Sequence, residues 1–95
     1  MPIRIERFKW HANILEKVVA KHGVDPTDVE SALWNTEVPP YIEKVGDRYI
    51  ALAQSESGGD YLLVVFAVRL GVETIITARR MTDAERRRFR QIRGT

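Results

Sequence analysis

The sequence predicts a compact, single-domain α+β fold, and three observations support this prediction. The chain has 95 residues, which is enough for one hydrophobic core and too few for two. Apolar residues follow a helical spacing in the first third and form β-branched runs between turn residues in the middle. A helical pattern returns at the C-terminus. We therefore treat residues 1–95 as one domain in which two N-terminal helices and one C-terminal helix pack on a mostly antiparallel sheet.

The N-terminal third predicts one strand and two helices. Residues 3–10 alternate as a strand, and from His11 the apolar residues recur at helical spacing. The resulting stripe consists of Ile14, Leu15, Val18 and Val19. Gly23 is suited to the left-handed residue that follows a helix. Residues 25–28 then predict the start of a short second helix, because they place a proline just after a capping aspartate. Its predicted buried side holds Val29, Ala32 and Leu33.

The middle of the chain predicts a hairpin and a further strand. Residues 35–47 form a connector, part of which packs on the core or forms an edge strand. Residues 48–54 and 61–69 are two strands joined by the loop 55–60. Residues 62–68 show almost no polar alternation, which predicts a central strand covered on both faces. Gly71 turns the chain into a strand over 72–78. Thr82 and Glu85 match a capping box for the last helix, and Phe89 and Ile92 form its apolar side.

Composition limits the possible functions. The chain contains no cysteine, so disulfide scaffolds and thiolate metal sites are excluded. Its longest apolar run is too short to cross a bilayer, so we expect no membrane association and place the protein in the cytoplasm. The sequence has no Gly-rich phosphate loop, no triad order and no metal-ligand spacing. We therefore expect neither a cofactor nor a bound metal.

The positive charge is concentrated at the C-terminus. Residues 79–95 carry seven arginines against two acids, although the net charge of the chain is only +2. Helical spacing places Arg86, Arg90 and Arg93 along one side of the last helix. Arg86, Arg87 and Arg90 are candidate contacts to RNA or to an acidic protein partner, although a solvated helix face fits as well.

Four segments together resemble the BrnT family of toxins. They are Trp10, then Lys21-His22-Gly23-Val24, then residues 48–52, and finally residues 76–87, which run Ile-Thr-Ala-Arg-Arg-Met-Thr-Asp-Ala-Glu-Arg-Arg. The order and spacing match over nearly the whole chain. Each segment alone is weak evidence, whereas their combination is specific.

The resemblance implies a RelE-like ribonuclease fold and toxicity through cleavage of an RNA substrate. It also implies a cognate antitoxin, a DNA-binding protein that neutralises the toxin and represses their shared operon, so that DNA is contacted only indirectly. Family members commonly carry an aspartate, a lysine and an asparagine where this chain has His11, Ile14 and Val18. These departures keep open an alternative, a catalytically inactive RNA- or protein-binding module with the same fold.

Arg79 and Arg80 are the first candidates for catalysis, since cleavage of RNA through its own 2′-hydroxyl needs positive charge around the phosphorus. A guanidinium stays protonated, so it can bind phosphate but cannot transfer a proton. Adjacent residues of a regular strand point to opposite faces, so only one of the two arginines shares a face with any one site; a bulge changes that. Alternatively, both arginines pair with acids such as Glu85 or cover apolar surface.

His22 is the candidate for proton transfer because imidazole titrates near neutral pH. A packed or helix-capping histidine fits the same position equally well. Lys21 is a candidate phosphate contact, or else a surface lysine that complements the helix dipole. Trp10 could stack on a base or serve as a core anchor. Glu6 and Glu73 are possible general bases if they face the arginines.

Overall fold

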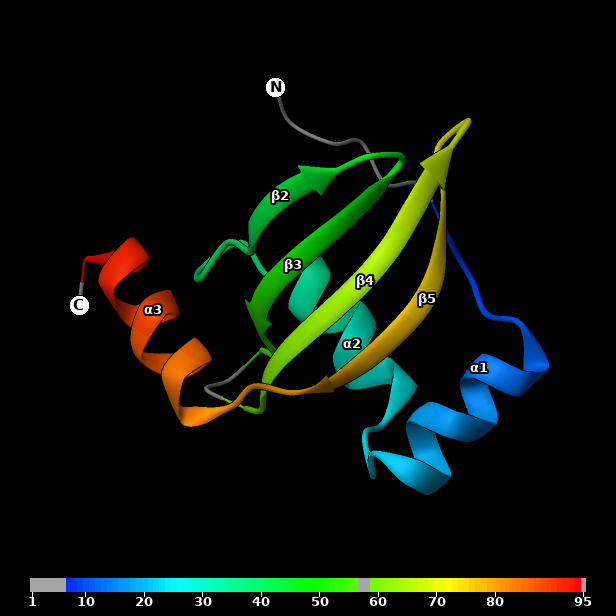
Figure 1. The fold of residues 1–95 in the computed structure, drawn as a ribbon, viewed down its shortest axis with the longest axis horizontal. Coiled ribbons are helices and arrows are strands. Elements are labelled where there is room, and N and C mark those ends of the chain that lie inside the picture. Colours follow the sequence, from blue (N-terminus) through cyan, green and yellow to red (C-terminus); the bar gives the residue numbers. More distant parts are fainter. Residues whose placement is uncertain (1–6, 57–58, 95) are drawn as a thin grey trace.

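Five strands form one sheet in the order β1-β5-β4-β3-β2 in the computed structural model, which describes residues 7–56 and 59–94 (Figure 1). The strands are β1 (Arg7–Lys9), β2 (Tyr41–Val45), β3 (Arg48–Gln54), β4 (Tyr61–Arg69) and β5 (Val72–Arg80). β1 pairs with β5 in parallel, and the other three pairs are antiparallel. The predicted α+β class is confirmed.

The helices divide unequally between the two faces of this sheet. α1 (Ala12–Glu16) continues into the π-helical turn η1 (Lys17–Lys21), and α2 (Pro26–Leu33) follows. In Figure 1 α2 lies behind the sheet and α1 lies beside its β5 edge, whereas α3 (Asp83–Arg93) packs on the opposite face, at one end of the strands. We call the face under α1 and α2 the helix face and the opposite one the open face.

The main core lies between the helix face and the first two helices. Val18, Val29 and Ala32 from the helices meet Leu62, Val64 and Phe66 of β4, and all six are fully buried. The second helix buries Val29, Ala32 and Leu33 as predicted, and the Asp25 side chain caps it by accepting a hydrogen bond from the Thr27 amide at 2.9 Å. Burial of this apolar surface is the principal stabilising contribution to the fold.

A smaller core forms where α3 meets the open face. Leu52, Met81 and Phe89 are buried there, and Tyr41, Tyr61 and Leu63 pack around them. The predicted capping box of α3 is present, since the Glu85 amide donates to the Thr82 hydroxyl and the Thr82 amide donates to Glu85 Oε1. α3 therefore starts immediately after β5 and covers only the nearest corner of the sheet.

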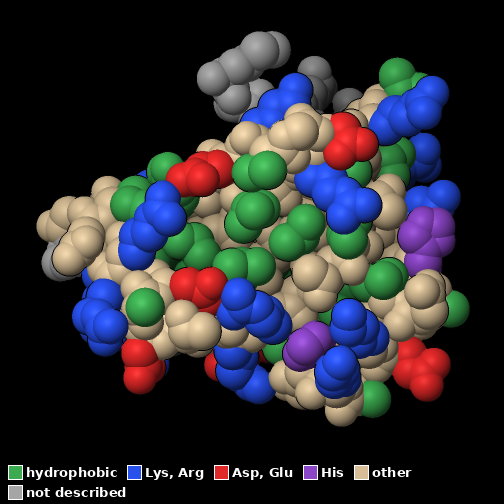
Figure 2. Space-filling view, in the orientation of Figure 1, with side chains coloured by type: hydrophobic (Ala, Val, Ile, Leu, Met, Phe, Trp, Pro, Cys, Tyr) green, Lys and Arg blue, Asp and Glu red, His purple; other side chains and the backbone are tan. Residues whose placement is uncertain are grey.

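The predicted hairpin is confirmed with the same strand bounds, whereas full burial of β4 is wrong. Leu62, Val64 and Phe66 are buried on the helix face, while Leu63, Val65 and Ala67 alternate with them and stay half-buried. β4 lies in the middle of the sheet as expected. However, α3 reaches only one corner, so apolar side chains remain visible over β3 and β4 (Figure 2).

The N-terminal elements differ more from the prediction. Leu15 and Val19 are 37% and 49% exposed, so the predicted apolar stripe reduces to the row of Ile14 and Val18, because a helix packed at the edge of a sheet buries only one narrow row. The first strand is described only over residues 7–9, and residues 3–6 of the predicted strand lie outside the described residues. β5 extends two residues beyond the predicted end, to Arg80.

Candidate functional site

A bulge in β5 decides which of its two terminal arginines reaches the helix face. The register pairs Val65 with Thr77 but Phe66 with Ile75, so β5 holds one extra residue at this point. Such an insertion exchanges the faces of all residues that follow it. As a result Arg80 stands opposite buried Leu62, on the helix face, and Arg79 stands opposite Leu63, on the open face.

Arg79 is engaged by the first turn of α3. Its Nη1 and Nη2 donate to Glu85 Oε1 and Oε2 at 2.8 and 2.9 Å, and Nη1 also donates to the Arg80 carbonyl at 3.1 Å. The hydrogen bonds with Arg79 lower the pKa of Glu85 and raise that of Arg79. The pairing with Glu85 that the sequence offered as an alternative is thus present. Arg79 holds the junction between β5 and α3 and is not free to bind a phosphate in this arrangement.

Arg80 joins two loops at the end of the sheet while keeping half of its side chain exposed. Its guanidinium donates to the backbone carbonyls of His22 and Gly23 at 3.3 and 3.2 Å and to Asp60 Oδ2 at 3.4 Å. These contacts are long for charge-assisted hydrogen bonds, and the side chain is 54% exposed. Arg80 can therefore accept a phosphate without first breaking a short ion pair.

The end of η1 brings Lys21 and His22 to the same place. The His22 amide donates to the Lys17 carbonyl, and Gly23 leaves the helix with φ of +62°, a conformation that favours glycine. The predicted helix end at Gly23 is confirmed. Among the described residues no side chain forms a hydrogen bond with the His22 imidazole.

The basic helix adds Arg86 to this site through an aromatic ring. Arg86 Cζ lies 4.8 Å from the centroid of the Tyr61 ring, and Arg90 Cζ lies 5.8 Å from it. Asp60, Tyr61, Arg80 and Arg86 line a shallow hollow of about 370 Å³. Tyr61 was not singled out from the sequence, because as the first residue of a strand it carries no signal for a cation-π partner.

A second, more enclosed hollow lies on the other side of the same tyrosine. It measures about 410 Å³, and its lining includes Tyr61, Phe89, Arg90 and Arg93. Arg86, Arg90 and Arg93 thus share one side of α3, as their spacing predicts. Figure 2 shows Lys, Arg and His side chains gathered along the edge of the molecule between the start of α3 and the end of η1.

Three of the candidate residues lie away from this cluster. Arg87 is exposed on another side of α3 and lines neither hollow. Trp10 packs against the main core, and its indole Nε1 donates to Glu30 Oε2 at 2.8 Å, which is the core-anchor arrangement. Glu73 is fully buried and lies seven residues before Arg80 on β5, so it does not reach the arginines at the end of the strand. Glu6 lies outside the described residues.

Burial controls the chemistry of Glu73. Neither carboxylate oxygen has a hydrogen-bond partner within the part of the chain that the structure describes, and loss of water, followed by repulsion from Glu30, raises the pKa of Glu73 to about 8.

In the described residues, His, Asp and Glu form no group of three that could ligate a metal. No described helix combines the length and the apolar character needed to span a membrane.

Comparison with known proteins identifies a structural relative. No protein-family model matches the chain, and no curated protein sequence does. A solved structure matches, that of the ribonuclease toxin BrnT of Brucella abortus, with a TM-score of 0.62 and 22% sequence identity over 81% of this chain and 97% of that chain. The chain has a BrnT-like fold. At this identity the similarity shows the fold alone, and the RelE-like relationship stays a prediction.

Proposed function

We propose that this chain is the toxin of a bacterial toxin–antitoxin pair and that it cleaves RNA in the cytoplasm without a metal. The observation that carries the proposal is the likeness of nearly the whole fold to a ribonuclease toxin. The cluster of Arg80, Arg86, Lys21 and His22 at one end of the sheet supports it, because these residue types suit a negatively charged backbone.

In this proposal the RNA supplies its own nucleophile. The 2′-oxygen attacks the adjacent phosphorus, the bond from phosphorus to the 5′-oxygen breaks, and a 2′,3′-cyclic phosphate forms. Arg80 binds the phosphate and stabilises the charge that develops on its oxygens. Arg86 lines the same hollow and contacts the next phosphate, and Lys21 adds positive charge from the end of η1.

His22 is the proposed proton-transfer group. It lies on the segment whose carbonyl holds Arg80, so the imidazole and the phosphate-binding guanidinium belong to one local structure. An imidazole can take the proton from the 2′-hydroxyl or give one to the 5′-oxygen near neutral pH. Arg79 is a positioning residue in this scheme, since its ion pair with Glu85 fixes the segment that carries Arg80.

The proposed partner is a cognate antitoxin that binds DNA and neutralises the toxin, so that this chain contacts DNA only through the antitoxin. The exposed arginines of α3, Arg87 included, are candidates for that interface. Their charge suits an acidic segment of the partner.

A second candidate function is an RNA- or protein-binding module without catalysis. The observation that favours it is the commitment of Arg79 to Glu85, which leaves one arginine rather than two at the end of β5 for a phosphate. This function predicts RNA binding without new RNA ends.

Induced expression in bacteria tests the proposal. Wild type, Arg80→Ala and Arg87→Ala are compared at equal protein level, with growth recorded and the 5′ ends of cellular RNA mapped. Arg87→Ala is the matched control, because it removes the same charge from an exposed position outside the hollows. We expect growth arrest and new RNA ends from wild type and Arg87→Ala, and neither from Arg80→Ala. Normal growth and intact RNA with soluble wild type would contradict the proposal and favour the binding module.

A further inference from the structure

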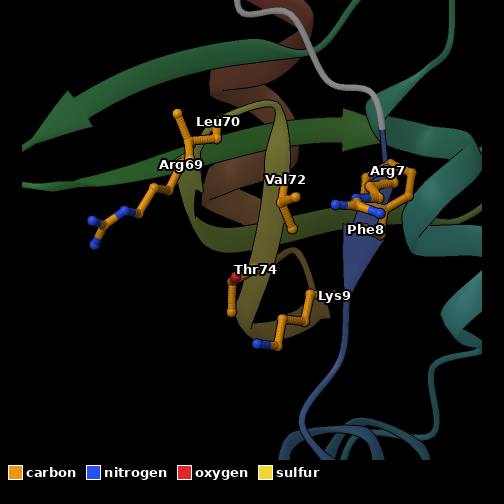
Figure 3. Close-up of a pocket in the computed structure, with 7 residues that line it drawn as sticks. All are labelled: Arg7, Phe8, Lys9, Arg69, Leu70, Val72 and Thr74. Atoms are coloured by element: carbon orange, nitrogen blue, oxygen red, sulfur yellow. The ribbon is translucent and has the colours of Figure 1, made fainter.

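A third basic hollow lies on the open face, at the end of the sheet far from Arg80. It measures about 530 Å³ and is lined by residues of β1, of the end of β4, of the β4–β5 turn and of β5 (Figure 3). Its polar and charged lining residues are Arg7, Lys9, Arg69 and Thr74. The proposed function makes no use of this region.

Three cations of this hollow share one face, and none has an acidic partner among residues 7–56 and 59–94. In the strand register Val72 lies between Arg7 and Arg69, and Lys9 pairs with the nearby Thr74. The side chains of the three cations therefore start from neighbouring positions of the sheet. No hydrogen bond or ion pair joins these three side chains to any described residue. By contrast, Arg79, Arg80 and Arg88 each have a carboxylate partner. The hollow therefore concentrates positive charge that no described carboxylate pairs with.

Leu70, at the rim of the hollow, is placed unfavourably for a residue that serves only the fold. Its side chain is 91% exposed, and its backbone is left-handed with φ of +52°. With Gly71 at φ of +77° it forms a two-residue hairpin turn in which asparagine, aspartate or glycine is preferred. A leucine there exposes apolar surface and strains the backbone. Both features are explained if Leu70 contacts another molecule.

The chemistry of the hollow selects one class of ligand. Its rim residue is aliphatic, whereas single-stranded nucleic acid is typically held by stacking on exposed aromatic rings. The one aromatic side chain in the lining, Phe8, packs against Trp34 at 4.7 Å between ring centroids. The site is concave, which suits a protein segment better than a bilayer surface. Positive charge around an aliphatic contact is complementary to an acidic segment with an apolar anchor.

We propose that this hollow docks an acidic segment of a protein partner, with an apolar side chain against Leu70 and carboxylates against Arg7, Lys9 and Arg69. The identity of that partner as the antitoxin rests on the proposed function. The hollow and the Arg80 site lie at opposite ends of β5. Changes in the hollow therefore weaken partner binding and leave RNA cleavage intact.

Charge reversal tests whether the three cations of the hollow bind the carboxylates of the partner. The probe is the protein encoded beside this chain's gene, purified and titrated into this chain by calorimetry. The triple variant Arg7→Glu, Lys9→Glu, Arg69→Glu is expected to raise the dissociation constant by about 30-fold or more. The control reverses three exposed cations outside the hollow, Lys17, Lys44 and Arg48, and is expected to stay within about threefold of wild type. Absence of binding by wild type, or equal loss in both variants, overturns the proposal.

Leu70→Asn tests the apolar contact without changing the charge. Asparagine suits a left-handed turn position, so the melting temperature should equal or exceed that of wild type, which separates lost binding from misfolding. We expect the dissociation constant for the same protein to rise by about tenfold. Binding by Leu70→Asn at the wild-type affinity overturns the role of Leu70.

Two further measurements test whether the hollow binds RNA or a membrane surface instead of a protein segment. A short single-stranded RNA and phosphatidylglycerol vesicles are titrated against wild type and the charge-reversed hollow variant. Selective loss of RNA or vesicle binding, with binding of the neighbouring protein unchanged, overturns the proposal in favour of that ligand. If wild type cleaves no RNA but still binds the neighbouring protein through the hollow, the proposed function fails while the docking site stands.

Discussion

The helix face of β5 carries one charged residue near each end, and the two ends differ completely in access to solvent. Glu73 is fully buried and neither of its oxygens has a hydrogen-bond partner among the described residues. Arg80 extends past the last buried residues, half exposed, and contacts two loops. The bulge at Ile76 places both residues on this face although seven positions separate them.

This difference shows that an unusual electrostatic environment does not by itself mark a functional site. A strongly raised pKa is often a pointer to catalysis, but Glu73 is fully buried, so its carboxyl is closed to any substrate. The end of β5 that carries Arg80 combines positive charge, exposure to solvent and further polar residues. We therefore expect changes at Arg80 to alter activity, and changes at Glu73 to alter stability and its pH dependence.

Arg80→Ala should have the largest effect on activity. Loss of the guanidinium that stabilises the phosphate should reduce the rate of RNA cleavage by about 100-fold or more. The free energy of unfolding should change little, since the side chain is half exposed and its hydrogen bonds are long. Initial rates on one RNA, measured for purified wild type, Arg80→Ala and Arg87→Ala, check this prediction. A rate for Arg80→Ala equal to that of Arg87→Ala would remove Arg80 from the site.

Glu73 should make the protein less stable as the pH rises. Its folded pKa of about 8 lies above the ordinary value of 4.5, so between these values the unfolded chain releases the proton while the folded chain keeps it. The stabilising contribution is complete below the ordinary pKa and decreases by about 1.4 kcal/mol per pH unit until the folded pKa is passed.

Urea unfolding of wild type and Glu73→Gln from pH 5 to pH 9 measures this dependence, with exposed Glu37→Gln as the control. In Glu73→Gln the free energy of unfolding should no longer decrease as the pH rises, whereas in Glu37→Gln it should decrease as in wild type. An unchanged slope in Glu73→Gln would show that the carboxyl reaches water.

The ion pair between Arg79 and Glu85 should contribute to stability more than to catalysis. Each alanine variant should lower the free energy of unfolding by about 1–2 kcal/mol, because it removes a bidentate pair, and Glu85→Ala also removes half of the capping box. A double-mutant cycle should give a coupling of about 1 kcal/mol. If Arg79→Ala abolishes RNA cleavage at unchanged stability, the phosphate-binding role belongs to Arg79 instead.

Lys21→Ala should give the smallest effect. A solvent-exposed lysine that contacts a phosphate should change RNA affinity by only about threefold and lower the slope of log affinity against log salt concentration by about one. Lys17→Ala, on the same helical segment, is the control and should leave the slope unchanged. Identical slopes for the two variants would place Lys21 outside the RNA path.

Local patterns predicted most of the fold correctly. The strand bounds of β3 and β4, the capping box at Thr82 and the helix end at Gly23 all depend on residues close in sequence. The parallel pairing of β1 and the partial burial of Leu63, Val65 and Ala67 depend on how distant elements meet. Periodicity carries no information on such contacts.

The candidate site was predictable in its residue types but not in its geometry. The sequence offered Arg79 and Arg80 as equivalent. Adjacent strand residues point to opposite faces, and a single inserted residue near Ile76 decides that Arg80, not Arg79, lies on the helix face. The approach of His22 to Arg80 spans 58 residues, and the role of Tyr61 depends on how α3 packs. The basic hollow at Leu70 was not predicted, because it combines β1, β4 and β5.

The most direct test of the central claim is incubation of the purified wild-type chain with a single-stranded RNA in excess EDTA, followed by analysis of the ends. The proposal predicts cleavage that EDTA leaves unchanged, with 2′,3′-cyclic phosphate and 5′-hydroxyl termini, and no such products from Arg80→Ala. Intact RNA under conditions in which the chain binds it, or cleavage that requires a divalent metal, would contradict a metal-independent ribonuclease centred on Arg80.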